Sequence, residues 1–174
     1  MTQKLAVLAC VAGLAAAGCG GDDPTAPTGP TTTTTILTAT LSSANEVPPI
    51  GNAEQGATGS ATVTFRVTRD PAGTVTASTV DFAVTMANFP AGSVARLSHI
   101  HTGAAGVVGP VLIDTTLSPS APVSMPSGTG SFSFTGVVVS AENAAAVLAN
   151  PAGFYFNVHT VLNGSGAIRG QLTR

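Results

Sequence analysis

The chain contains little cysteine, lysine or charge, and each shortage excludes a class of protein or partner. Of its 174 residues, two are cysteines and 8% are charged. Cys10 lies inside an N-terminal apolar segment. If that segment is removed, Cys19 has no cysteine partner and no intrachain disulfide can form. The fold must then depend on its apolar core, and the chain is long enough to build one.

Positive charge is sparse and dispersed. Lys4 is the single lysine, five arginines are spread along the rest of the chain, and the formal net charge is −2. Nucleic acids and anionic membrane surfaces attract proteins through clustered positive charge. The sequence therefore predicts no nucleic-acid partner.

Residues 1–18 have the pattern of an export signal. Lys4 precedes the apolar run Leu5–Leu14, which suits a signal peptide and is too short to span a bilayer. The small residues before Cys19 are similar to a bacterial lipobox, in which the cysteine is acylated and becomes the new N-terminus. We expect an exported lipoprotein, anchored to the membrane through lipid on Cys19 and facing the periplasm or the cell exterior. Ordinary signal cleavage, leaving Cys19 as a free thiol, is the alternative.

Residues 20–35 are rich in Gly, Pro and Thr and contain no apolar residue larger than Ala. Such a segment buries too little surface to offset its ordering entropy, and its prolines favour extended conformations. We therefore predict a flexible tether over 19–35 and a folded domain over 36–174.

From residue 36 onward, apolar and polar residues alternate with a period of two. In Ala61–Thr68 the apolar side chains all fall on one face, which is typical of a half-buried strand. Further strands are expected with Val80, Phe82, Val84 and Met86 on one face, with Phe132, Phe134 and Val138 on one face, and over Phe154–Val161 and Ala167–Leu172. Ala141–Ala149, capped by Ser140 and ended by Asn150-Pro151, predicts one short helix. This pattern favours an all-β sandwich or partly open barrel with a crossover helix.

Two of the three histidines occur in His99-Ile100-His101. Side chains two apart on a strand point the same way, so both imidazoles would face one side. His159 lies on another expected strand. If the strands are neighbours, His99, His101 and His159 could bind one copper or zinc ion and leave an open coordination position, with Glu46 or Asp114 as a candidate fourth group. Alternatively, the histidines are structural and donate hydrogen bonds to backbone carbonyl groups.

Other chemistry is poorly supported. The sequence has no G-x-S-x-G turn, and its glycine-rich stretch 103–110 lacks the lysine of a phosphate-binding loop. Arg169, on an expected strand, is predicted to pair with an acid across the sheet, and Glu46 is the candidate partner in a structural ion pair. We therefore expect a protein that is not an enzyme, with metal-dependent redox activity as an open alternative.

Four motifs, in order, resemble the CHRD domain family, first described in chordin and also found in bacterial proteins. They are Leu41–Pro49, His99–Pro110, Phe154–Thr160 and Ile168–Leu172. The resemblance implies an immunoglobulin-like or superoxide-dismutase-like antiparallel β-sandwich. The family usually has an acid directly before the Ile-Arg-Gly-Gln run, whereas this chain has Ala167. Three histidines are too few for the two-metal site of a copper–zinc dismutase.

The function we expect is a lipid-anchored, non-catalytic binding or interaction module at the cell envelope, with an unknown protein or extracellular ligand as its partner. A mononuclear copper or zinc protein that uses the three histidines is the second possibility. A structural envelope protein is the third.

Overall fold

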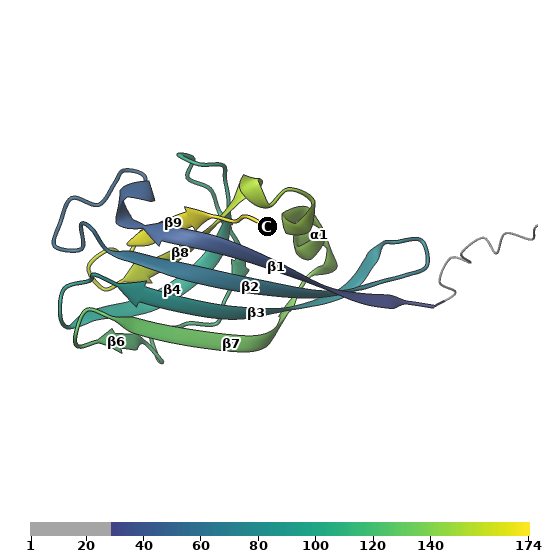
Figure 1. Cartoon of the computed structure of the whole chain (residues 1–174), viewed down its shortest axis with the longest axis horizontal. Helices are drawn as coiled ribbons and strands as arrows, with labels where there is room; N and C mark the ends of the chain where they lie inside the picture. The colour runs from purple at the N-terminus through teal and green to yellow at the C-terminus, as the bar shows by residue number, and fades with distance from the viewer. Residues whose placement is uncertain (1–28) are drawn as a thin grey trace, which may run out of the picture.

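The computed structural model describes residues 29–174 (Figure 1). The expected signal peptide, Cys19 and the tether up to residue 28 lie outside the described residues. The strands are β1 (Thr31–Ser42), β2 (Thr58–Arg69), β3 (Val75–Ala87), β4 (Ser93–Thr102), β5 (Val111–Asp114), β6 (Val123–Met125), β7 (Gly130–Val139), β8 (Phe154–Thr160) and β9 (Ile168–Gln171). One α-helix, α1 (Ala141–Ala149), and two short 3-10 turns, η1 (Ser43–Asn45) and η2 (Pro151–Gly153), complete the fold.

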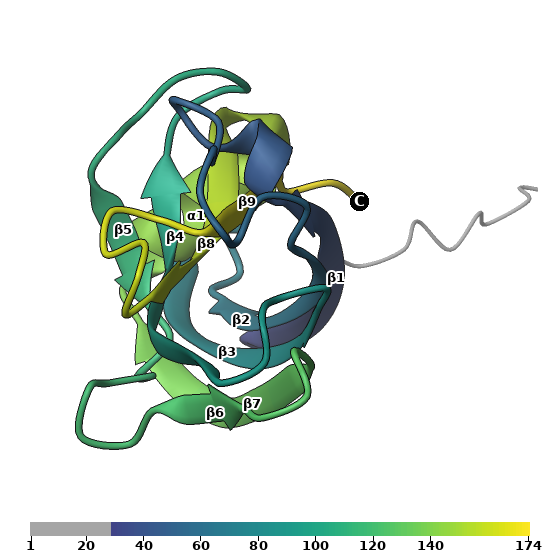
Figure 2. The same ribbon diagram turned by 90° about the vertical axis from the view of Figure 1, so that its left-hand side faces the viewer.

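The strands form one antiparallel sheet that curls almost into a barrel (Figure 2). The order is β5-β4-β8-β9-β1-β2-β3-β7, and β6 pairs with β4. The β1–β2–β3–β7 half and the β4–β8–β9 half join where Ser42 pairs with Arg169. The prediction of an all-β fold is confirmed, and hydrogen bonding continues from one half of the structure to the other.

Apolar residues from both halves fill the interior. The four apolar residues of the Ala61–Val67 run are at most 1% exposed, as the alternation predicts. Phe82 of β3 packs toward Phe156 of β8, with ring centroids 6.1 Å apart. Burial of apolar side chains is the main favourable term in folding, so this interior stabilises the curled sheet.

One side chain of β7 does not lie on the predicted face. Phe132 and Phe134 are turned inward and half-buried, but Val138 is 84% exposed. An extra residue lies in β7 between the pairs Phe82–Phe134 and Val80–Val137, at Gly136, whose φ is +67°. A bulge shifts the period by one residue, so the side chains after it exchange faces.

The predicted helix is present with the predicted bounds. Ser140 Oγ accepts a hydrogen bond from the Asn143 N–H at 3.1 Å, which satisfies one free donor of the first turn. The helix connects β7 to β8, in opposite halves of the sheet, and buries Ala144, Val147 and Leu148. No helix within residues 29–174 combines the length and apolar character that crossing a bilayer requires.

The folded domain begins earlier than the sequence predicts. Thr31–Thr35, assigned to the tether, belong to β1 and pair in register with Phe65–Arg69. The side chains of Thr31–Thr34 are exposed, so the composition gave no sign of this strand. Backbone pairing to β2 orders the threonines where burial does not, and the paired ribbon extends beyond the body of the domain (Figure 1).

Candidate metal centre

Two neighbouring strands carry the three histidines. His99 and His101 lie on β4 and His159 on β8, which pair directly. Ile100 between the first two is fully buried in the apolar interior, so alternation places both imidazoles on the opposite, outer face of the sheet. The register sets His159 across from Leu97, one step diagonal to His99. The condition that the sequence left open, that these strands be neighbours, is met.

The three imidazoles are buried although they lie on the outer face. His99 and His101 are 8% exposed and His159 is 7% exposed. The loop after β4 contacts His101 through Gly109, and the turn after β8 contacts His159 through Gly164. Loops thus cover this part of the sheet and create a second, polar interior.

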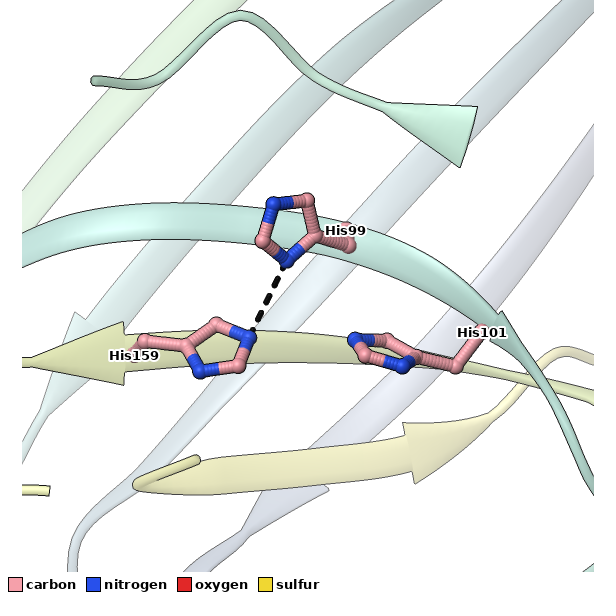
Figure 3. Close-up of side chains that lie close together, drawn as sticks. All are labelled: His99, His101 and His159. Carbon is pink, nitrogen blue, oxygen red and sulfur yellow. Dashed lines mark hydrogen bonds between the residues drawn. The ribbon is translucent and has the colours of Figure 1, made fainter. Parts of the chain in front are cut away.

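One ring nitrogen of each imidazole faces the space between the rings (Figure 3). One nitrogen from each ring can be chosen so that the three atoms lie within 4.8 Å of one another. His99 Nδ1 and His159 Nε2 are 3.1 Å apart. A tetrahedral ion with bonds of 2.0–2.1 Å holds its donors about 3.3 Å apart, which is close to the spacing of the His99 and His159 nitrogens.

Backbone carbonyl groups fix the orientation of two of these rings. His101 Nδ1 lies 3.0 Å from Gly109 O, and His159 Nδ1 lies 3.1 Å from Gly164 O. A carbonyl oxygen only accepts, so each Nδ1 carries the proton and donates it. Each Nε2 then carries a lone pair directed at the cluster. Metal-bound histidines are held by such hydrogen bonds in the same way.

The lone pair of His101 has no partner. Among the side chains of residues 29–174, His101 Nε2 is one of two buried nitrogen or oxygen atoms without a hydrogen bond; the other is Asn157 Oδ1. Leaving a buried acceptor unsatisfied costs about 1–3 kcal/mol. If His101 served only to stabilise the fold, a side chain without an unsatisfied nitrogen would avoid this cost.

Burial keeps the three imidazoles neutral near pH 7. It lowers the pKa of His159 to about 4, against a partly opposing hydrogen bond to Gly164 and with help from His99 and His101. Burial also lowers the pKa of His99 and of His101 below the usual value. Neutral imidazole is the form that binds metal, so protons compete weakly for these nitrogens.

Comparison with known families identifies the domain. Residues 37–172 match the CHRD domain family. This chain belongs to the CHRD family. No curated protein and no solved structure matches the chain. Membership of the CHRD family indicates a non-catalytic binding module. Among the described residues of this CHRD domain, the three histidines form the group of side chains whose ring nitrogens lie close enough together to share a ligand.

Glu46 and Asp114, the two residues that the sequence offered as a fourth ligand, lie outside the cluster of three histidines. Glu46 Oε1 accepts a hydrogen bond from Asn157 Nδ2 at 3.1 Å, and the group of possible ligands contains only the three histidines. Asp114 Oδ2 is 4.0 Å from His99 Nε2, on the side of that ring away from His159. Asp114 therefore does not face the nitrogens that could share an ion.

The predicted ion pair between Glu46 and Arg169 is not a direct contact. Of the residues that the structure describes, Arg66 and Asp81 have oppositely charged groups within 4.0 Å of each other, and the neutral His99 lies 4.0 Å from Asp114. Arg169 acts on Glu46 through space only. Burial outweighs this attraction and raises the pKa of Glu46 to about 7. Backbone carbonyl groups of the 104–107 loop accept from Arg169, and the side-chain amide of Asn157 donates to Glu46.

Arg169 instead belongs to a stack that the sequence did not reveal. Its Nη2 donates to Val107 O at 3.0 Å, and its Cζ lies 3.7 Å from the centre of the Tyr155 ring. Tyr155 stacks in turn on His101, with centroids 4.9 Å apart and planes 7° apart. Tyr155 precedes His159 by four residues on β8, and side chains an even number of residues apart on a strand point to the same face. This spacing was the one feature of the sequence that could have indicated that Tyr155 lies beside the histidines.

A buried carboxylate that the sequence analysis did not single out supports the turn beneath His159. Glu54 is 1% exposed, and its Oε2 accepts from Thr160 Oγ1 at 2.6 Å and from Asn163 Nδ2 at 2.5 Å. These bonds hold the β8–β9 turn that presents Gly164 O to His159. Glu54 lies in a loop without periodic pattern, so no local signal marked it.

Proposed function

We propose that this CHRD domain is a non-catalytic module that binds one copper or zinc ion through His99, His101 and His159. The observation that supports this most strongly is the buried, unpartnered Nε2 of His101, which is turned toward the other two rings. Two neighbouring backbone carbonyls orient donors toward the same point. Imidazole nitrogen suits both metals.

The burial of the three histidines favours storage of a metal ion over metal-dependent catalysis. All three residues are at most 8% exposed, so covering loops leave little of the donors in contact with solvent. A catalytic ion needs an open position for water or substrate, whereas a stored ion does not. Storage or delivery of the metal is the role we propose.

The test compares two aromatic substitutions. In His101→Phe the ring that stacks on Tyr155 is kept and the donor nitrogen is lost, whereas Tyr155→Phe leaves all three donors in place. Protein is produced without a polyhistidine tag, exposed to copper or zinc, desalted and analysed by elemental mass spectrometry. We expect one ion per chain in the wild type and in Tyr155→Phe, and none retained in His101→Phe. Equal metal in the two variants, with both folded by circular dichroism, would contradict the proposal.

We also propose that the protein is exported and anchored by lipid on Cys19. The apolar run and the small residues before Cys19 support this. In cells fed labelled palmitate, Cys19→Ala is expected to lose the label and Cys10→Ala to keep it, because Cys10 lies within the removed segment. Label that persists in Cys19→Ala would rule out the lipobox.

A further inference from the structure

Two buried side-chain atoms of residues 29–174 lack a hydrogen-bond partner, and both lie on the outer face of the β4–β8 pair. They are His101 Nε2 and Asn157 Oδ1. Asn157 is 2% exposed, so solvent offers its oxygen no ready partner. Leaving a buried acceptor unsatisfied costs free energy, and two such acceptors on one face indicate a shared occupant. An ion bound by the histidines alone would account for His101 and leave Asn157 unexplained.

Asn157 stands next to all three histidine positions. It pairs directly with His99, and the register sets His101 one step diagonal to it. His159 follows two residues later on the same strand, so its side chain lies on the same face. Directly opposed residues have Cβ atoms about 4.5–5.5 Å apart, and diagonal ones are about 7–8 Å apart. An asparagine side chain at this position is therefore within reach of an ion held by the three imidazoles.

The amide nitrogen of Asn157 is already engaged. Nδ2 lies 3.1 Å from Glu46 Oε1 and 3.4 Å from Glu46 Oε2, and it donates to this carboxyl group. A carboxyl group has an accepting oxygen in either protonation state, so the contact identifies the nitrogen arm of the amide. Glu46 follows Asn45, whose Nδ2 donates to Arg169 O of β9. Because β9 and β4 flank β8 on opposite sides, the oxygen arm remains for the β4 side.

Asp114 flanks His99 from the other side. It pairs with His99 from β5, and its Oδ2 lies 4.0 Å from His99 Nε2, whereas His99 Nδ1 lies 3.1 Å from His159 Nε2. The nitrogen that can share an ion with His159 is thus not the one beside Asp114. The Asp114 side chain is 62% exposed, so it supplies a screened negative charge that favours a cation nearby. The residue that stands on the β8 side of His99 is Asn157.

We propose that Asn157 Oδ1 is the fourth ligand of the ion that the three histidines hold. Three imidazole nitrogens and one oxygen form a complete tetrahedral set, which zinc prefers, and an amide oxygen also serves as the weak fourth ligand in some copper sites. Both unsatisfied atoms then bind the same ion, and no position is left for water. This inference rests on the proposed function, and it supplies the reason why the centre stores an ion rather than presenting it to a substrate.

The first test asks whether the fourth position is closed in the wild type. Protein without a tag is loaded with Co(II), or with Cu(II) if it retains copper alone, and titrated with azide. The visible absorption of either ion reports its ligands. We expect no spectral change in the wild type, because no bound water is there to be displaced. In Asn157→Ala water should take the vacated position, and azide should then shift the spectrum. Azide binding to the wild type, or equal spectra in the two proteins, would overturn the proposal.

The second test separates a ligand from a residue that acts through Glu46. Asn157→Asp keeps Oδ1 and loses the donor to Glu46, whereas Asn157→Ala loses both. In chelator competition with the metal that the wild type retains, Asn157→Ala should bind about tenfold more weakly or worse, and Asn157→Asp should bind at least as tightly as the wild type. Glu46→Gln keeps an acceptor for Asn157 Nδ2 and is the matched control, with affinity unchanged within about threefold. Circular dichroism checks that each variant is folded. Equal weakening in Asn157→Asp and Asn157→Ala would show that Asn157 acts by holding Glu46.

The failure of this inference differs from the failure of the proposed function. A wild type that retains neither copper nor zinc would overturn the proposed function itself. Equal metal affinity in the wild type and Asn157→Ala would leave the three-histidine centre intact. It would show that a buried water, and not the ion, satisfies Asn157 Oδ1.

Discussion

The molecule has two buried regions, one on each face of the β4–β8–β9 half of the sheet, and they are built differently. The inner face carries apolar side chains such as Ile100 and Phe156, both fully buried. The outer face carries the histidines, Asn157 and Arg169, which loops cover to a nearly equal extent. Equal burial therefore does not imply equal chemistry.

The comparison separates stability from binding. In the apolar interior, each side chain gains from leaving water, and no polar partner has to be found. In the polar region every buried group must be hydrogen-bonded or bear a cost. The residual cost falls on His101 Nε2 and Asn157 Oδ1. We expect substitutions on the inner, apolar face to change stability. Substitutions on the outer, polar face should change binding and the response to pH.

The largest expected effect is on the apolar side. Phe65 is fully buried, and Phe65→Ala should lower the free energy of unfolding by about 3–5 kcal/mol through lost transfer energy and the cavity left behind. Urea unfolding measures this. The matched control is Thr62→Ala, an exposed residue of the same strand, which should change stability by less than about 1 kcal/mol. A loss below about 1 kcal/mol in Phe65→Ala would contradict the placement of the core.

The second expected effect is a pH dependence set by Glu46. Its pKa is raised to about 7 by burial, so the folded state holds the proton more tightly than the unfolded chain. The stability that this contributes is complete below the unfolded pKa of about 4.5 and is lost as the pH rises through 7. Glu46→Gln should therefore gain stability relative to wild type between pH 4.5 and 8, by about 3 kcal/mol.

The measurement is urea unfolding of both proteins across this pH range in the presence of a chelator. His159 acts in the opposite sense. Its pKa is lowered to about 4, so the stability it contributes is present above pH 6.5 and is lost as the pH falls through 4. His159 is common to both proteins and cancels in their difference. A difference that does not change with pH would show that Glu46 is not held in a buried, uncharged form.

A smaller effect is expected from the support beneath His159. Glu54→Ala removes the acceptor of Thr160 Oγ1 and Asn163 Nδ2 and should cost about 1–3 kcal/mol. If the centre binds metal as proposed, affinity should also fall about tenfold or more, because the turn that orients His159 loosens. Chemical denaturation and chelator competition measure the two effects. Gln55→Ala, an exposed neighbour, is the control and should change neither. Unchanged affinity in Glu54→Ala would separate this network from the histidine site.

The smallest effect is expected at Asp114. Its side chain is 62% exposed and lies 4.0 Å from His99 Nε2, so solvent screens the pair. Asp114→Asn should change stability by less than about 0.5 kcal/mol and metal affinity by less than about tenfold. Loss of binding in this variant would make Asp114 a ligand and would contradict the three-histidine assignment.

Much of the fold and the central part of the site were predictable from local patterns. Alternation in Ala61–Thr68 predicted the strand and its buried face, and Ser140 with Asn150-Pro151 predicted the helix bounds. The shared direction of His99 and His101 followed from their spacing. Thr31–Thr35 and Val138 were predicted wrongly, because β2 pairing and the Gly136 bulge involve partners or backbone angles that composition does not encode.

The sequence by itself determined the period of the strands, and with it which side chains share a face, because an extended backbone alternates whatever its neighbours are. The tertiary structure alone decided which strands lie side by side and which loops cover the outer face. It brought His159 beside the first two histidines, placed Glu46 against Asn157, and stacked Arg169 on Tyr155. These contacts join residues far apart in the chain, and a polar group accepts whichever partner the packed backbone brings within reach.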